Sequence, residues 1–220
     1  MTDNYLFITE VGSRMWGMEN FASDYDLFHV FQQPSSDYLR KGIFKQTRAA
    51  KTYMQDGKEI DAQYWEIGHL IHQLKKGNVN AIWGVCSGVV WKNSNELKTL
   101  RDIVIANISK ESYHSIRGMA MSQFSDATKR AAVRDPEKSL WTCTRTLNFG
   151  CNLLFAGYVG FEKPTTSAID EEFCKEEFKI LDECYKLSTL PDHVNPKPFE
   201  DFLWNIRMSE ILDNFTVKLK

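Results

Sequence analysis

The chain has 220 residues, 43% of them hydrophobic, and a formal net charge of −2. This length and composition allow one large or two small globular domains with a substantial core, and they exclude a low-complexity chain. The small net charge excludes a general electrostatic attraction to nucleic acid, so any RNA contact must come from a local basic patch.

The cysteines and the apolar segments predict a cytoplasmic protein that does not bind a membrane. Five cysteines are widely spaced and form no CxxC pair, which is typical of reduced, mostly buried thiols. The polar first residues predict no signal peptide. The most apolar stretch, residues 147–161, contains two asparagines and is too short to span a bilayer.

A phosphate-binding turn is predicted near the start of the chain. Residues 5–9 have the composition of a strand, and Gly12-Ser13 follows them. Such a turn presents backbone N–H groups to a phosphate. Gly12 and Gly17 also have the glycine spacing of a P-loop, but Met18-Glu19 follows where that loop requires Lys and then Ser or Thr. A P-loop is therefore excluded.

Two acidic residues, Asp24 and Asp26, open the next apolar run. In a strand, side chains two positions apart share one face, about 7 Å apart at the backbone. Two like charges this close favour a bound divalent cation. The alternative is a solvated turn, because Ser-Asp-Tyr-Asp is good turn composition. The nearby Gly12-Ser13 favours the metal site, since nucleotidyl transfer needs a held triphosphate and Mg²⁺ or Mn²⁺.

A third carboxylate is predicted on the next hairpin. Residues 51–55 and 58–62 flank Asp56-Gly57, a strong two-residue hairpin signal. If the hairpin lies beside the preceding strand, Asp61 completes a three-carboxylate cluster. Glu59, on the same face of its strand, is the less favoured substitute.

Asp61 has a second interpretation, as the cap of a helix. Apolar residues recur at helical spacing over residues 63–76, and Gly77-Asn78 then forms a C-cap pair. Aspartate is favoured at a helix N-cap, so Asp61 at the start of this helix would have no catalytic role.

From residue 94 onward the patterns are almost wholly helical, and Asp135-Pro136 is a clear helix start signal. We expect an α+β fold: a small mixed β-sheet core with helices over residues 1–93, and a helical subdomain over residues 94–220 that completes a cleft. The predicted helices of that subdomain cover residues 97–107, 111–132, 137–158, 171–187 and 199–214.

Two cations of the third of these helices, Lys138 and Arg145, lie two turns apart on one face. They could reach a phosphate together. The alternative is that each makes an ordinary surface ion pair.

These motifs resemble the DNA polymerase beta superfamily of nucleotidyltransferases. More specifically, the chain is similar to the predicted nucleotidyltransferases associated with RNA repair and RNA ligase operons. The order and spacing match through about residue 90, and residues 113–120 and 138–145 resemble that group's helical half more weakly. The segments that carry the resemblance are Gly12-Ser13-Arg14-Met15-Trp16-Gly17, Ser23-Asp24-Tyr25-Asp26, Ile60-Asp61-Ala62-Gln63-Tyr64-Trp65 and Leu74-Lys75-Lys76-Gly77-Asn78.

The resemblance implies site roles for the first group of motifs. Gly12 and Ser13 would bind the triphosphate. Asp24 and Asp26 would bind Mg²⁺ (or Mn²⁺), and Asp61 would be the third catalytic acid.

It also makes Arg14 and Lys76 expected contacts to the nucleotide. The chain departs from the pattern after Lys76, where Val79 replaces a common Pro and residues 82–84 replace a Glu-Trp pair. The chain therefore lacks the acid that relatives often carry in this segment.

The implied activity is transfer of a nucleoside monophosphate from a nucleoside triphosphate, with ATP favoured, to a hydroxyl acceptor, with release of pyrophosphate. The implied acceptor is an RNA end, with tRNA as one candidate. Two alternatives remain open. One is adenylylation of a protein or small molecule, and the other is a non-catalytic nucleotide-binding or antitoxin-like module that kept the fold.

Overall fold

A five-stranded mixed sheet forms the centre of the first half of the chain. The computed structural model describes residues 5–21, 23–35, 48–129, 135–166 and 169–218. The strand order is β3-β4-β2-β1-β5, in which β2 and β4 are parallel and the other neighbours antiparallel. The strands are β1 (Tyr5–Val11), β2 (Tyr25–Phe31), β3 (Arg48–Gln55), β4 (Lys58–Glu66) and β5 (Val90–Lys92).

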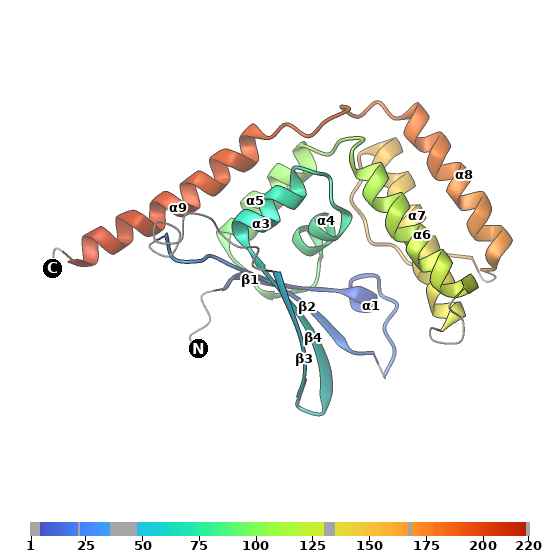
Figure 1. The fold of residues 1–220 in the computed structure, drawn as a ribbon, viewed down its shortest axis with the longest axis horizontal. Coiled ribbons are helices and arrows are strands. Elements are labelled where there is room, and N and C mark those ends of the chain that lie inside the picture. The colour runs from blue at the N-terminus through green and yellow to red at the C-terminus, as the bar shows by residue number, and fades with distance from the viewer. Residues whose placement is uncertain (1–4, 22, 36–47, 130–134, 167–168, 219–220) are drawn as a thin grey trace.

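Helices cover one side of this sheet and extend beyond it at both ends. In Figure 1, α3, α4 and α5 lie over the sheet, α6, α7 and α8 form a group beside α1, and α9 lies at the opposite end. The helices are α1 (Gly12–Met15), α3 (Ile67–Leu74), α4 (Val79–Cys86), α5 (Asn95–Ala106), α6 (Ser112–Lys129), α7 (Pro136–Ala156), α8 (Glu171–Leu187) and α9 (Lys197–Lys218). The predicted α+β fold is confirmed.

The central strand β2 lies between β1 and β4. Its residues Leu27, Phe28, His29 and Val30 are all buried, and Leu27 packs with side chains of β4 on the face opposite the helices. Because successive side chains alternate, Asp26 shares the face of Phe28 and Val30, which pack in the main core under the helices. The start of β2 therefore carries Asp26 toward the helical side of the sheet.

The predicted hairpin is confirmed. Asp56 and Gly57 both have positive φ, 51° and 74°, as the two central residues of a type I′ turn require. Its strands are longer than predicted: β3 begins at Arg48, and β4 continues to Glu66.

The predicted start of the helix at residue 63 is wrong. Residues 63–66 continue β4, because the strand pairs with β2 along its whole length, up to Phe31 opposite Glu66. Glu66 is the N-cap of α3 and accepts a hydrogen bond of 2.6 Å from the Gly68 N–H. Asp61 lies within the strand, so its interpretation as a helix cap is also wrong.

The predicted end of that helix is confirmed. Gly77 has a φ of +62°, and the Asn78 N–H donates to the Gln73 carbonyl at 3.1 Å, the pattern of a Schellman motif. A Cβ at Gly77 would lie 2.7 Å from the Ser112 nitrogen at the start of α6. This turn therefore requires glycine for both its conformation and its packing.

All five helices predicted after residue 94 are present; α8 has the predicted bounds, and the others have shifted ends. The α7 start signal is confirmed, because the Asp135 carboxylate accepts from the Lys138 N–H and Pro136 is the first helical residue. The end predicted for α6, residue 132, lies outside the described residues.

The hydrophobic core is continuous from Phe7 and Trp83 to Leu147 of α7, so the domain division at residue 93 stays a prediction. Within the described residues, no helix has both the length and the apolar character needed to cross a membrane.

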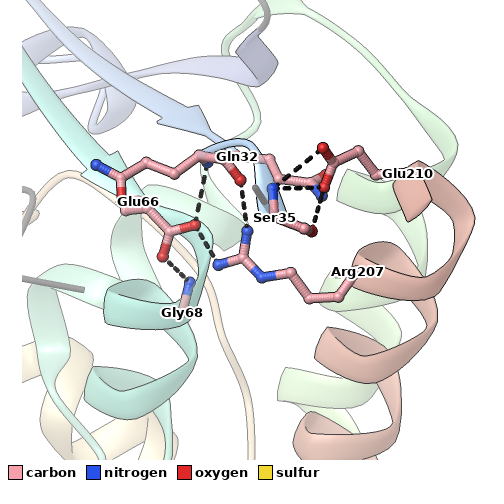
Figure 2. Close-up of polar contacts among 7 residues, drawn as sticks. Gln32, Ser35, Glu66, Gly68, Arg207 and Glu210 are labelled. Atoms are coloured by element: carbon pink, nitrogen blue, oxygen red, sulfur yellow. Dashed lines mark hydrogen bonds and ion pairs between the residues drawn. The ribbon is translucent and has the colours of Figure 1, made fainter. Parts of the chain in front are cut away.

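A polar network joins α9 to the ends of β2 and β4 (Figure 2). The Arg207 guanidinium forms an ion pair with Glu66 and donates to the Gln33 carbonyl at 3.1 Å. One turn further along α9, the Glu210 carboxylate accepts from the Ser35 N–H and from the Gln32 amide at about 3.1 Å. Because Glu66 also caps α3, the network fixes the point where the sheet meets its helical layer.

We expect Arg207→Ala to lower the free energy of unfolding by about 2 kcal/mol, because it leaves the carboxylate of Glu66, only 1% exposed, without its cation. Urea denaturation measures this change. Lys75→Ala is the matched control, since it removes an exposed ion pair between α3 and Glu200 of α9 and should cost less than about 1 kcal/mol. Equal losses in the two variants would contradict the role given to the buried pair.

Candidate active site

The aspartates of β2 and β4 face each other across two neighbouring strands. Asp26 and Asp61 are register partners in the parallel pair, so their side chains lie on the same face of the sheet. The Asp61 carboxylate accepts a hydrogen bond from the Thr52 hydroxyl of β3. Glu59, the substitute considered from the sequence, pairs with Met54 beyond the start of β2. The register therefore favours Asp61 over Glu59 as the neighbour of Asp26.

Asp24 lies just before the strand, because β2 begins at Tyr25. The prediction that both acids lie in one strand is therefore wrong by one residue. Asp24 is exposed and its charge acts on Asp26. The charges of the two acids thus interact, although the two side chains are not successive residues on one face of a strand.

Gly12 brings the first turn directly against Asp26. The glycine has a φ of +70°, and a Cβ added to it would lie 1.8 Å from the Asp26 Oδ2 atom. Val11, the residue before it, is the register partner of Asp26 in the β1–β2 pair. Only glycine fits here, because any side chain would displace the carboxylate. The carbonyl of the next residue, Ser13, accepts from Trp16 and Met18 and closes the turn.

The surroundings of Asp26 perturb its protonation. Burial, followed by the negative charges of Asp61 and Asp24, raises the pKa of Asp26 from 3.8 to about 6. The positive charge of Lys138 opposes this rise in pKa, and the charge of Glu10 adds to it. Perturbed carboxylates in such surroundings are typical of functional sites, although structural networks produce them too.

Both predicted cations of α7 act on this carboxylate. Lys138 is exposed in the first turn of α7, and Arg145 lies two turns further on, half-buried. Burial lowers the pKa of Arg145 to about 10, while the charge of Asp26 opposes that change. The Arg145 guanidinium stacks over the Trp16 ring at 5.3 Å from its centroid. The α7 helix thus supplies positive charge opposite the aspartates.

Arg14 is held by three contacts with β1 and with the start of β2. Its Nε atom lies 3.1 Å from a Glu10 carboxylate oxygen, its Nη2 atom donates to the Ser23 carbonyl, and its guanidinium lies 4.3 Å from the Tyr25 ring centroid. Tyr25 and Asp26 point to opposite faces of β2. These contacts favour a structural role, and a phosphate contact by Arg14 stays a prediction.

Lys76 lies at the turn after α3. This turn packs against the start of α6 rather than against α1. Its side chain is exposed. Within the described residues, no hydrogen bond or ion pair joins Lys76 to the aspartates. A role for Lys76 at the nucleotide stays a prediction.

The carboxylates have the donor chemistry that Mg²⁺ or Mn²⁺ requires, namely oxygen ligands. In the part of the chain that the structure describes, no three His, Cys, Asp or Glu side chains are already gathered as a metal site. The repulsion of Asp61 and Asp24 on Asp26 is nevertheless the condition that a bound cation relieves. The donor set therefore fits a divalent cation.

Sequence reasoning missed one residue beside this site, Glu10. Glu10 is 2% exposed and accepts a hydrogen bond of 2.8 Å from the Trp91 indole. Burial raises the pKa of Glu10, yet its place in β1 gives no sign that it is buried.

Trp16 has two interpretations from the sequence, because an aromatic residue near the phosphate turn could stack on a base or cover the core beneath the loop. Trp16 is 2% exposed and packs edge-on against Phe149 of α7. Its burial favours the second interpretation.

A comparison with protein families matches the part of the chain that carries these residues. The model of a family described as "RlaP: RNA repair pathway DNA polymerase beta family" matches residues 2–150. The crystal structure of a nucleotidyltransferase-like protein from Exiguobacterium sibiricum 255-15 is 13% identical, with a TM-score of 0.36, and the match covers 84% of this chain and 70% of that one. A TM-score this low supports no inference. None of the curated proteins compared with the chain matches it.

We expect Asp26→Asn to raise the free energy of unfolding near pH 7 by about 2 kcal/mol in the absence of divalent cations. Folding raises the pKa of Asp26 to about 6, so the folded state binds the proton more tightly than the unfolded state. Stability therefore falls as the pH rises from the unfolded pKa of about 3.8 to the folded value. The gain in the variant should shrink toward pH 4.

Urea denaturation at several pH values measures this dependence. Asp102→Asn, which changes an exposed acid of α5, is the control and should follow the wild type throughout. A stability difference for Asp26→Asn that does not change with pH would contradict the assigned cause.

Proposed function

Because its model matches residues 2–150, the chain belongs to the RNA repair pathway DNA polymerase beta family, and we propose that it transfers a nucleoside monophosphate to a hydroxyl at an RNA end. Membership of this family makes the protein a polymerase beta-type nucleotidyltransferase in an RNA repair context. The proposed donor is a nucleoside triphosphate, with ATP favoured, and pyrophosphate is released.

One observation carries the proposal. Burial, followed by the negative charges of Asp61 and Asp24, raises the pKa of Asp26, and the positive charges of Lys138 and Arg145 interact with this carboxylate. Acids beside cations are what nucleotidyl transfer requires, because a triphosphate brings negative charge that both a metal ion and cationic side chains must balance. In a purely structural cluster, each of these acids would instead form an ion pair with a neighbouring cation.

The proposed site would hold Mg²⁺ or Mn²⁺ on Asp24, Asp26 and Asp61. When bound, the cation would neutralise the triphosphate and lower the pKa of the acceptor hydroxyl. The close approach of Gly12 to Asp26 places the Gly12-Ser13 turn where it could hold the triphosphate beside these carboxylates.

The side chains divide the remaining work. Asp61 takes the proton of the acceptor hydroxyl while the oxygen of that hydroxyl forms a bond to the α-phosphorus. The bond between the α-phosphorus and its bridging oxygen breaks, and the electron pair leaves with pyrophosphate. Lys138 and Arg145 stabilise the negative charge that develops on that leaving group.

The RNA acceptor rests on the family. Adenylylation of a protein or small molecule uses the same transfer chemistry and differs only in the acceptor. A binding module without activity would keep the nucleotide site and lose turnover. All three aspartates are present in the chain, which argues against that last alternative.

We expect label from ribonucleoside triphosphates marked at the α-phosphate to enter mixed tRNA in the presence of Mg²⁺ or Mn²⁺. Asp24→Ala/Asp26→Ala should reduce incorporation to background, because it removes two of the three acids that would hold the cation. Asp102→Ala is the control for loss of an exposed acid and should retain full activity. The readout is radioactivity in RNA and in cellular protein, separated by gel electrophoresis.

The label distinguishes the three functions. Label in RNA that the double variant abolishes supports the proposal. Label in protein instead supports adenylylation. Nucleotide binding without label in any acceptor would support the binding module and contradict the proposed transfer.

We expect millimolar Mg²⁺ to raise the melting temperature of the wild type by about 2–4 °C, because the ion binds the folded state and relieves the repulsion at Asp26. Asp26→Asn should abolish the rise. Glu59→Gln changes an exposed acid of the same strand as Asp61 and should leave the rise intact. An equal rise in all three proteins would show that Mg²⁺ acts elsewhere.

A further inference from the structure

An exposed aromatic side chain lies three residues before Asp24, in the connection between α1 and β2. The Phe21 ring is 93% exposed, and within the described residues it joins neither of the two hydrophobic clusters. An exposed ring gives up the stabilisation that its burial would provide. Single exposed apolar residues are common on protein surfaces, so exposure alone assigns no function to Phe21. Its contacts and its place beside the aspartates indicate one.

Hydrogen bonds on both sides of Phe21 fix the backbone that carries the ring. The Ser23 N–H donates to the Asn20 carbonyl at 3.1 Å, and the Asn20 N–H donates to the Ser23 hydroxyl at 2.8 Å. The Arg14 guanidinium donates to the Ser23 carbonyl at 3.2 Å and ties this turn to α1. A ring on an ordered turn loses less conformational entropy when it binds a ligand than a ring on a free loop.

Lys58 of β4 binds to the same turn. Its Nζ atom donates to the Phe21 carbonyl at 2.8 Å and lies 4.9 Å from the centroid of the Phe21 ring. Within the described residues, the Lys58 ammonium group forms no ion pair. An ammonium group has three N–H donors, so the two that remain are available to an anionic ligand. An exposed ring and an unneutralised cation therefore lie side by side.

This pair lies where β4 leads into the candidate active site. The first register pair between β2 and β4 joins Tyr25 to Ile60, so beside Lys58 the α1–β2 connection takes the place of strand β2. Lys58 precedes Asp61 by three residues, which is about 10 Å along a strand. A ligand that contacts the Phe21 ring can therefore extend around the start of β2 to the aspartates.

We propose that Phe21 and Lys58 hold the end of the RNA acceptor, with a base stacked on the phenyl ring and a backbone phosphate on the ammonium group; this inference rests on the proposed function. Aromatic faces stack on bases of any sequence, and a lysine binds a phosphate as a point charge. A ring beside a cation thus matches the bases and phosphates of one nucleic-acid strand. Because stacking requires an unstacked base, the pair selects single-stranded ends.

The test is binding of a short single-stranded oligoribonucleotide in the presence of Mg²⁺, measured by fluorescence anisotropy at several salt concentrations. Phe21→Ala should weaken binding about tenfold, as expected for loss of one stacked base, and Phe21→Trp should restore it. Lys58→Gln should weaken binding and reduce the slope of log affinity against log salt concentration by about 0.7, the effect of one phosphate contact. All three variants should bind inorganic tripolyphosphate like the wild type.

Two matched controls remove the same kinds of side chain elsewhere. Trp204→Ala removes an aromatic side chain, 65% exposed, from α9, which lies at the opposite end of the sheet from α1 in Figure 1. Lys98→Gln removes an exposed cation from α5. Both variants should bind the oligoribonucleotide like the wild type, and an equal loss of affinity in them would overturn the inference.

Unchanged RNA affinity in Phe21→Ala would also overturn the inference. Transfer of label to RNA by that variant, with the KM for RNA of the wild type, would overturn it too while leaving the proposed function standing. Transfer to protein that Phe21→Ala abolishes would assign the surface to a protein acceptor instead. Absence of both RNA binding and transfer to RNA in the wild type would overturn the inference and the proposed function together.

Discussion

The parallel pairing of β2 with β4 is the constraint on which the rest of the structure depends. Its register sets Asp26 beside Asp61 at one end and Phe31 beside Glu66 at the other. A slip by one residue would turn the side chains of one strand to the opposite face. The acids would then separate, and Glu66 would lose its place at the start of α3. The candidate active site and the docking of α9 therefore depend on the same register.

Charge is balanced across the site by elements from both halves of the chain. The sheet provides negative charge at Asp26 and Asp61, and α7 provides Lys138 and Arg145. The balance is incomplete, because the pKa of Asp26 stays raised. Burial of this carboxylate, together with the repulsion from Asp61 and Asp24, destabilises the folded protein and at the same time favours a bound cation. Trp16 connects the two halves physically, since it packs on α7 and carries the stacked guanidinium of Arg145.

Features that depend on a few neighbouring residues could be predicted from the sequence. The Asp56-Gly57 turn and the Asp135-Pro136 helix start are of this kind, because local backbone preferences determine them. The start of α3 could not be predicted, since residues 63–66 have helical spacing and pairing with β2 holds them in a strand. The motif spacing identified the acids and cations that the structure brings together. It could not show that Arg14 is tied to Glu10, because burial of a strand glutamate depends on tertiary packing.

The ion pair between Glu66 and Arg207 joins residues 141 positions apart. Synthesis on the ribosome proceeds from the N-terminus, and early segments begin to fold before later ones emerge. The sheet and α3 can therefore assemble while Glu66 still has no cation, and Arg207 neutralises this carboxylate only when α9 emerges. Completion of the polar network at the end of the sheet is thus coupled to synthesis of the last helix.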